Sequence, residues 1–404
     1  MGARRMDAAG WRLVALAVAA PLLATGCAAA IASNDTPPAA GQIGPVTPVA
    51  ASSPIRISPP DGSTQLPPGS RVSVNSVGGA LKHVDLTDPA GNYLPGEFSL
   101  DRTVWTSAAP LAPGQNFAVD ASTLGTNGRS IEQRSTISTA DVPDPNRLAI
   151  ASVTPSDGRQ IGVAYPLIVT FNHPVTKRKA VSDALTVETS PHVEGAWFWM
   201  DSSTVDYRPE NFWTPGTLVT LHANLAGVAG GDNLWGVANT TSAFTVARSE
   251  VINVDLKNDR MTVERDGATV GDFPVSAGKP GWRTRDGIMT VMERDTDKTW
   301  TNTAIDAPEA YVLHSKYAMR ITNSGEFIHD APWNRGKIGE YNSSHGCVGM
   351  LTSDMAKVFA GAMVGDAVIV TGSGRPFGSV ANRIGDWNVP WAQWVGGNYD
   401  LSFR

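Results

Sequence analysis

Between about Pro54 and Ala247 the sequence is a succession of short strand-like runs separated by turns, and this pattern constrains the fold most. Leu167–Phe171 is apolar or β-branched throughout, and Arg71–Val74 alternates between polar and apolar residues. Frequent short strands with Gly- or Pro-containing turns are typical of β-sandwiches. The turn signals are Asp61-Gly62, Pro89-Ala90-Gly91, Pro113-Gly114, Asp157-Gly158 and Pro215-Gly216.

An internal repeat divides this β region into two. Pro59-Pro60-Asp61-Gly62 matches Pro155-Ser156-Asp157-Gly158, and Ser135–Thr139 parallels Ser242–Val246. The repeat predicts two Ig-like modules, at residues 54–147 and 148–247, with the stretch Pro143-Asp144-Pro145 as the hinge.

Four aromatic residues cluster in the second module: Trp197, Phe198, Trp199 and Trp213. Aromatic residues in a sandwich usually pack in the core or between domains. A carbohydrate-stacking surface is the alternative, and the sequence leaves it open.

The third region, residues 248–372, reads as a mostly β domain with one clear helix. Ser353 is the expected N-cap of that helix, and Gly361 is expected just past its end. The tail, 373–404, carries three Trp residues in a short stretch, and exposing three indoles is costly. We therefore expect the tail to pack on the third region. The expected strands are Val251–Leu256, Met261–Glu264, Ile288–Met292 and Ala367–Val370.

The N-terminus has the pattern of an export signal. Arginines precede an apolar run, Leu13–Leu23, which is shorter than the ~20 residues that a membrane span needs. Small residues then lead to Cys27, as in a bacterial lipobox, which predicts a signal peptide (1–27) and lipid on Cys27. The Ala-, Pro- and Ser-rich stretch 28–53 is typical of a disordered tether. We expect an exported protein, anchored to the outer face of the cell membrane and facing the cell wall.

Charge and cysteine content narrow the function classes. A net charge of −6 over 404 residues argues against a nucleic-acid binder. The chain has two Cys, and lipid on Cys27 would leave Cys347 without a disulfide partner. A single exported thiol points to a reactive group.

Reactive groups gather between Phe327 and Cys347. A thiol needs a base to react near neutral pH, and either His329 or His345 can supply it. Gly346 frees the backbone to aim N–H groups at an oxyanion. A buried structural Cys is one alternative. A zinc site is another, but apart from Asp330 no fourth ligand stands nearby.

The spacing of His329, fifteen residues, and then His345-Gly346-Cys347 preceded by Ser344 resembles the signature of L,D-transpeptidases with the YkuD-type fold. The likeness covers most of the chain, from the lipobox and two Ig-like modules to the Trp-rich extension of actinobacterial members. It implies a YkuD-type catalytic domain at 248–372 and no cofactor.

The resemblance also implies roles for individual residues. Cys347 would be the nucleophile and His329 the general base, while His345 would be a structural histidine. The backbone amides of His345, Gly346 and Cys347 would lie near the oxyanion. Other positions match substrate-cleft or flap residues, namely Tyr311, Ser324, Gly325, Asp330 and Gly349, and Lys279 matches the Gly-Lys before a conserved turn of the family.

Three positions depart from the family pattern. Gly349 stands where Asn is usual, which removes a side-chain amide from the cleft. Asp330 follows the first His in place of a small residue, and the Thr-Pro-x-Gly turn reads Thr284-Arg285-Asp286-Gly287.

The implied reaction joins the third residue of a donor tetrapeptide stem, through a Cys347 thioester, to a neighbouring stem in a 3→3 cross-link. Peptidoglycan stem peptides would be donor and acceptor, and carbapenems would acylate the thiol. Two rivals remain at this point: an L,D-carboxypeptidase or cysteine peptidase, which transfers the acyl group to water, and an inactive wall-binding lipoprotein.

Overall fold

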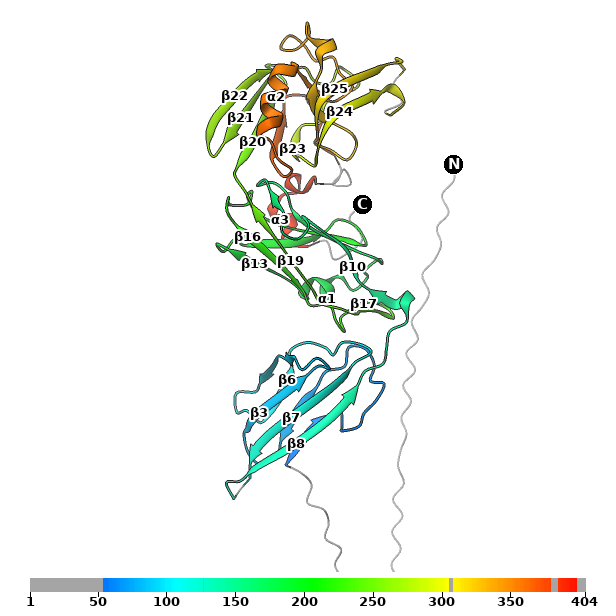
Figure 1. Ribbon diagram of the computed structural model, residues 1–404, viewed down its shortest axis with the longest axis vertical. Helices are drawn as coiled ribbons and strands as arrows, with labels where there is room; N and C mark the ends of the chain where they lie inside the picture. Colours follow the sequence, from blue (N-terminus) through cyan, green and yellow to red (C-terminus); the bar gives the residue numbers. More distant parts are fainter. Residues whose placement is uncertain (1–53, 126, 305–307, 379–383, 398–404) are drawn as a thin grey trace, which may run out of the picture. The chain divides into compact units, whose positions relative to one another are not determined.

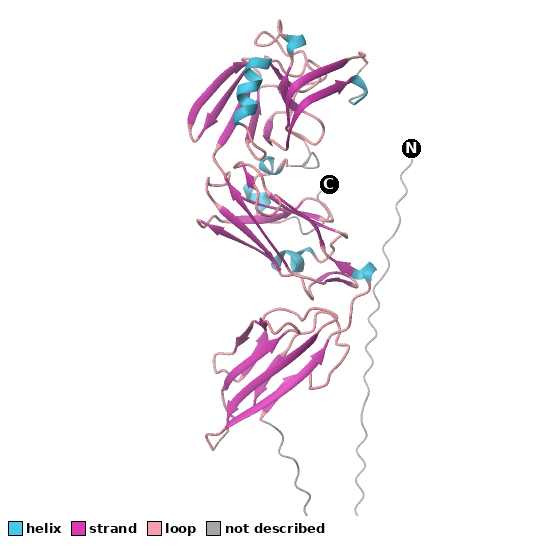
Figure 2. Ribbon diagram, viewed as in Figure 1, coloured by secondary structure: helices cyan, strands magenta, loops and turns pink. Residues whose placement is uncertain are grey.

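The computed structural model describes residues 54–125, 127–304, 308–378 and 384–397. Strands dominate these residues (Figure 2), which confirms the expected mostly β fold. The expectations about the signal peptide, the tether and Cys27 concern residues outside this part. Within the described residues, no helix is both long and apolar enough to span a membrane.

The first module consists of two four-stranded antiparallel sheets (Figure 1). Val74, Trp105 and Val119 are buried in the core that fills it. One sheet has the order β1 (Ile55–Ser58), β2 (Ser73–Ser76), β6 (Val104–Ser107) and β5 (Gly96–Phe98). The other has the order β4 (Tyr93–Leu94), β3 (Leu81–Thr87), β7 (Asn116–Leu124) and β8 (Ser130–Ser138).

The second module also has two four-stranded sheets, together with a small three-stranded one. The first sheet is β10 (Ile150–Thr154), β12 (Leu167–Phe171), β15 (Thr204–Pro209) and β14 (Gly195–Trp199). The second is β11 (Gln160–Ile161), β19 (Thr240–Val246), β16 (Leu218–Ala223) and β13 (Leu185–Ser190). The third is β17 (Ala229–Gly231), β18 (Leu234–Gly236) and β9 (Arg147–Leu148), with α1 (Arg178–Asp183) nearby.

The two copies of the Asp-Gly repeat make equivalent hydrogen bonds. Asp61 accepts from the Thr136 amide at 2.7 Å, and Asp157 accepts from the Ala243 amide at 2.8 Å. The glycine after each Asp has a positive φ, 75° and 72° respectively, a conformation that favours glycine. The repeat in the sequence therefore corresponds to a repeated turn structure.

Three of the four aromatic residues of the second module lie inside the protein, and Trp197 is partly buried. Trp199 and Trp213 are buried, and Phe198 is only 4% exposed. The Trp199 indole N–H donates to Ser182, and the Trp213 indole N–H donates to the Tyr165 carbonyl. These three rings cannot form an exposed platform for sugars.

The third region holds two sheets and α2 (Thr352–Gly361), whose buried Met355 and Val358 join the core between them. The five-stranded sheet is β22 (Ala268–Pro274), β21 (Arg260–Arg265), β20 (Glu250–Asp255), β28 (Ala367–Thr371) and β23 (Gly287–Thr290). The four-stranded sheet is β24 (Glu293–Thr301), β25 (Val312–Arg320), β26 (Phe327–Asp330) and β27 (Val348–Met350). Short 3-10 helices occupy Asp144–Asn146, Asn302–Ala304, Pro332–Asn334 and Asp386–Asn388.

The expected ends of α2 were wrong by one or two residues. Ser353 lies within the helix. The N-cap position is Leu351, whose apolar side chain makes no capping hydrogen bond. The hydroxyl of Thr352 instead donates to the Asp330 carboxylate at 2.9 Å, so a distant strand secures the first turn. Gly361 is the last helical residue.

The Trp-rich extension packs on the third region, as expected, and also contacts the second module. Asn388 exchanges hydrogen bonds with both backbone groups of Ile288 on β23. In α3 (Trp391–Trp394), however, the Trp394 ring stacks on Phe198 of the second module at 4.9 Å. The guanidinium of Arg208 lies within 5.4 Å of three indole rings, those of Trp387, Trp391 and Trp394.

Candidate functional site

Two neighbouring parallel strands bring the reactive residues together. His329 on β26 pairs with Gly349 on β27, and Cys347 stands two residues before Gly349. Side chains two residues apart along a strand share a face, so Cys347 and His329 point to the same side of the sheet. Both line a cavity of about 480 Å³.

The sequence-predicted cleft residues that line this cavity are Tyr311, Ser324, Gly325, His345 and Gly349. Trp300 and Trp333 line it as well, and their rings lie 4.8 Å and 5.8 Å from the His329 ring. The cavity therefore has a thiol and an imidazole on its wall and indoles around the imidazole.

His329 is held in one tautomer by its neighbours. Its Nδ1 lies 2.9 Å from the Asp330 carbonyl oxygen and 3.0 Å from the Ser315 Oγ. A carbonyl only accepts, so Nδ1 carries the proton and Nε2 keeps a lone pair. Ser315 is fixed in turn, because it donates to the Asp330 carbonyl and accepts from the Trp300 indole.

Burial moves the two reactive groups in opposite directions. It raises the pKa of the Cys347 thiol to about 12, and the Glu326 carboxylate adds to this rise. It also lowers the pKa of His329 below its ordinary 6.5. Desolvation disfavours the charged form of each group, so the resting pair at neutral pH is a thiol and a neutral imidazole.

His345 has different neighbours. Its Nε2 lies 3.2 Å from a Glu309 carboxylate oxygen, and its ring stacks on Tyr311 and meets Trp282 edge-on. Lys279 binds the other oxygen of Glu309 at 2.9 Å. The imidazole of His345 thus ties the segment carrying Glu309 and Tyr311 to the loop before Cys347. Among the described residues, His329 Nε2 makes no hydrogen bond, whereas His345 Nε2 lies close to Glu309.

The loop before Cys347 is held by its own serine. Ser344 Oγ accepts from the Gly346 amide at 3.0 Å and donates to the Cys347 carbonyl at 2.6 Å. Gly346 has a φ of 129°, which few other residues adopt. The Gly346 amide, expected near the oxyanion, is therefore already used within the loop.

Asp330 does not line the cavity, which corrects the expectation that it is a cleft residue. Its side chain is only 2% exposed, and its carboxylate accepts from the Tyr317 amide and from Thr352. The position contributes to the site through its backbone carbonyl, which orients His329.

Gly349 lies where a side chain would be crowded. A Cβ atom there would stand 3.2 Å from the Ala331 Cβ and 3.4 Å from the Ser276 carbonyl oxygen. The backbone of Gly349 also exchanges two hydrogen bonds with Ser276. This close packing is a physical reason for glycine at this position.

Sequence reasoning missed four residues around the site: Thr284, Trp300, Ser315 and Glu326. Each lies at least 20 residues before Cys347 in the sequence, and the fold brings it next to His329, Cys347 or the preceding Gly346. The one signal for Thr284 was its place in the turn that departs from the family pattern. Within the described residues, no group of three or more His, Cys, Asp or Glu could hold a metal ion.

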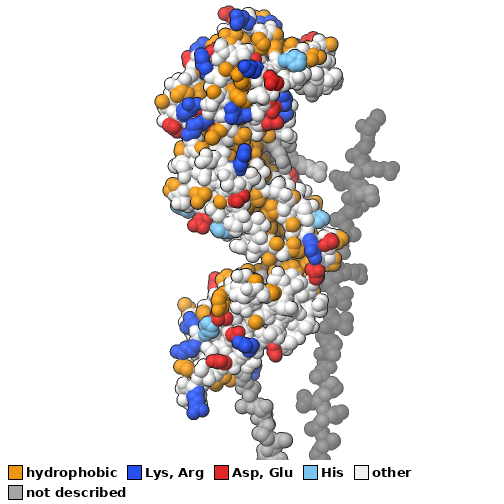
Figure 3. Space-filling model, in the orientation of Figure 1, with side chains coloured by type: hydrophobic (Ala, Val, Ile, Leu, Met, Phe, Trp, Pro, Cys, Tyr) orange, Lys and Arg blue, Asp and Glu red, His pale blue; other side chains and the backbone are white. Residues whose placement is uncertain are grey.

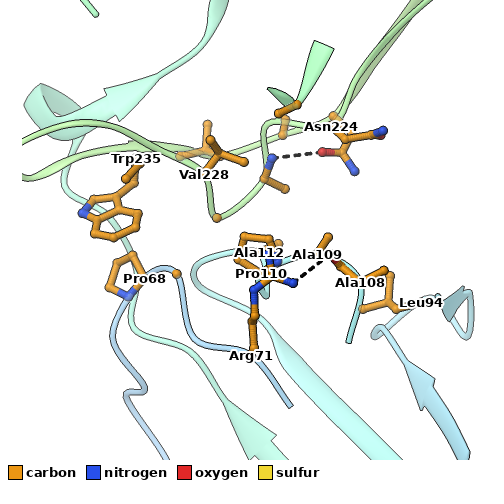
Figure 4. Close-up of a pocket in the computed structure, with 18 of the residues that line it drawn as sticks. Pro68, Arg71, Leu94, Ala108, Ala109, Pro110, Ala112, Asn224, Val228 and Trp235 are labelled. Carbon is orange, nitrogen blue, oxygen red and sulfur yellow. Dashed lines mark hydrogen bonds between the residues drawn. The ribbon is translucent and has the colours of Figure 1, made fainter. Parts of the chain in front are cut away.

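A larger hollow elsewhere holds no comparable chemistry. It measures about 990 Å³ and is lined largely by Ala, Pro and Gly residues (Figure 4). The guanidinium of Arg71, which is labelled in the figure, donates hydrogen bonds to the backbone carbonyls of Ser107 and Ala108. On the face of the molecule shown in Figure 3, Lys and Arg mix with Asp and Glu. The smaller cavity around Cys347 is therefore the candidate active site.

Comparison with known proteins agrees with this choice. A family profile described as "L,D-transpeptidase catalytic domain" matches residues 249–370, and one described as "Bacterial Ig domain" matches residues 63–229. L,D-transpeptidase 5 of Mycobacterium tuberculosis is 32% identical over 83% of this chain and 75% of its own length. L,D-transpeptidase 2 of the same species is 31% identical over 84% of this chain and 83% of its own length.

Among solved structures, LdtMt1 in complex with imipenem is 31% identical and covers 55% of this chain and 99% of its own, with a TM-score of 0.49. L,D-transpeptidase 3 of Mycobacterium tuberculosis, solved with a faropenem-derived adduct, is 29% identical and covers 55% of this chain and 98% of its own, with a TM-score of 0.47.

Proposed function

The chain belongs to the L,D-transpeptidase family of acyltransferases, and we propose that it forms 3→3 peptidoglycan cross-links with Cys347 as nucleophile and His329 as general base. The observation that carries the assignment is that His329 on β26 and Cys347, directly before the neighbouring strand β27, line one cavity. The Asp330 carbonyl leaves His329 Nε2 as the proton acceptor.

In the first half-reaction the Cys347 sulfur attacks the carbonyl of the third residue of a tetrapeptide stem. Because the thiol is protonated at rest, its proton passes to His329 Nε2 as the C–S bond forms. The tetrahedral intermediate then breaks its C–N bond. His329 returns the proton to the departing D-Ala amine, which leaves a thioester on Cys347.

In the second half-reaction the side-chain amine of a neighbouring stem attacks the thioester. His329 takes the proton of the amine, the C–S bond breaks, and the sulfur regains a proton as the amide forms. Two half-reactions on one nucleophile predict ping-pong kinetics. A carbapenem offers a strained carbonyl to the same thiol, so we propose carbapenems as acylating inhibitors.

Mass spectrometry of the intact protein tests this proposal. With tetrapeptide, we expect an acyl adduct on the wild-type chain with loss of D-Ala, and no adduct on Cys347→Ala. Cross-linked dimer as the main product supports transpeptidation, whereas tripeptide alone shows transfer to water. A Cys347→Ala variant that still forms dimers overturns the assignment.

We also propose that lipid on Cys27 anchors the enzyme to the outer face of the cell membrane. The support is the apolar run ending in small residues before Cys27 and a substrate that lies in the cell wall. Labelling cells with a radioactive fatty acid should mark the wild-type chain and leave Cys27→Ala unmarked. Equal labelling of both chains contradicts the proposal.

A further inference from the structure

A buried threonine touches the peptide group that precedes the nucleophile. Thr284 is completely buried, and its Oγ1 donates to the Gly346 carbonyl oxygen at 2.8 Å. The Thr284 hydroxyl oxygen in turn accepts from the Gly278 amide at 3.0 Å. A hydroxyl has one proton to donate, and here that proton goes to the residue directly before Cys347.

This contact sets the direction of the Cys347 amide. In a trans peptide group the C=O and the following N–H point in opposite directions. With the Gly346 carbonyl directed at Thr284, the Cys347 N–H points away from Thr284. Cys347 lines the cavity and Thr284 does not. Within the described residues, no backbone hydrogen bond takes up the Cys347 amide.

We propose that Thr284 is a positioning residue, whose hydroxyl holds the Gly346–Cys347 peptide so that the Cys347 amide can donate to the oxyanion of the acylation step. This inference rests on the proposed function. The Gly346 amide already donates to Ser344, so the Cys347 amide carries more of the oxyanion's stabilisation.

The turn that carries Thr284 is itself fixed on both sides. The Arg285 amide donates to the Glu326 carboxylate at 3.1 Å, and the Arg285 guanidinium pairs with the same carboxylate at 2.9 Å. Asp286 accepts from the amides of Ser373 and Gly374 at 2.9 and 2.8 Å. A hydroxyl on a turn held this firmly has a defined direction, which an oxyanion site requires.

The test compares two reactions of the same thiol. Acylation by a carbapenem passes through an oxyanion, whereas alkylation by iodoacetamide displaces iodide at a saturated carbon and forms no oxyanion. We expect Thr284→Val, which keeps the shape and loses the hydroxyl, to slow acylation by ~10- to 100-fold. Its alkylation rate should stay near the wild-type value, and Thr284→Ser should restore acylation.

Thr290→Val is the matched control. Thr290 is equally buried, and its hydroxyl donates to the Ala164 carbonyl at 3.0 Å, away from the Cys347 loop. Thr290→Val should lower the free energy of unfolding without changing the ratio of the acylation rate to the alkylation rate. If Thr284→Val does not fold, Thr284→Ala removes the same hydroxyl and supplies the same ratio.

Two outcomes overturn the inference: wild-type acylation by a folded Thr284→Val or Thr284→Ala, or an equal fall in acylation and alkylation. Failure of the proposed function looks different, because the wild-type chain itself would then resist acylation.

Discussion

His329 and Cys347 are both uncharged at rest, because burial lowers the pKa of one and raises that of the other. The thiol becomes a strong nucleophile only when the imidazole takes its proton. Catalysis at this site therefore depends on proton transfer during attack, and the pH profile of acylation reports on it.

The pH dependence of acylation tests this role. A base whose pKa is lowered stays neutral as the pH falls, so the wild-type rate should be level from pH 8 to about 6.5 and decline only below the lowered pKa. His329→Gln should acylate ~10²- to 10⁴-fold more slowly at pH 7. Its rate should then rise about tenfold per pH unit, because the thiolate fraction grows that way below a pKa near 12. Stopped-flow measurement of carbapenem acylation provides both curves, and a level curve for the variant contradicts the role of His329.

Gly349 offers a second prediction at the residue scale. Gly349→Asn should lower the free energy of unfolding by about 1–2 kcal/mol, because its Cβ needs room that the Ala331 Cβ occupies at 3.2 Å. The double variant Gly349→Asn/Ala331→Gly should lose less free energy of unfolding than the sum of the losses of the two single variants. Urea titration of the four proteins measures this coupling. Strict additivity of the two changes contradicts the steric explanation.

At the scale of the structural elements, three residues tie the chain just before β25 to the loop before Cys347. This latch consists of Lys279, Glu309 and His345. Hydrogen bonding, chiefly from Lys279, lowers the pKa of Glu309 to about 2. A lowered carboxyl pKa stabilises this paired arrangement above the ordinary value of 4.5, and the effect is lost only as the pH falls through about 2. The Glu309 carboxylate is therefore ionised at every pH at which the enzyme would be assayed.

Glu309→Gln tests the latch, because it keeps the shape and removes the charge. We expect faster hydrogen exchange at the Tyr311 amide and faster alkylation of Cys347 by iodoacetamide. Glu293→Gln is the control, since Glu293 pairs with Arg320 on the same two strands and lies outside the latch. Equal exchange rates in wild type and Glu309→Gln contradict the role of the latch in holding this part of the chain.

The elements also show which parts of the fold and the site can be predicted from the sequence. Alternation predicted β20 and β21, because strands with one buried face repeat every two residues, and two further short runs predicted β23 and β28. The His329 and Cys347 pair followed from a motif within nineteen residues. Ser315 and Thr284 could not be found this way, since their contacts join residues 14 and 62 positions apart. The start of α2 was misplaced for the same reason, because its first turn is secured by Asp330 on another strand.

For the whole molecule, the second module and the catalytic domain are joined by more than the chain between them. Gly162 and Ala164 donate backbone hydrogen bonds to Val364 and Gly365 at 2.9 and 2.8 Å. The extension adds to this junction, because Trp394 donates to the Ala196 carbonyl and Arg208 donates to the Val389 carbonyl. We infer that the two domains unfold together.

Trp394→Ala tests this cooperativity. Removing a fully buried indole should cost about 3–5 kcal/mol, and calorimetry should then resolve separate transitions for the second module and the catalytic domain, which share one transition in the wild-type chain. Trp391→Ala is the control, because Trp391 lies on the same short helix and is only partly buried. A single unshifted transition in Trp394→Ala contradicts the inference.

The protonated state of Cys347 has one more consequence, which concerns the lifetime of the enzyme. Oxidants such as peroxides react with the thiolate to give a sulfenic acid, and further oxidation gives irreversible sulfinic and sulfonic acids. A thiol whose pKa is raised to about 12 presents almost no thiolate between turnovers. The raised pKa that keeps Cys347 protonated until His329 takes its proton therefore also protects the catalytic sulfur from oxidation.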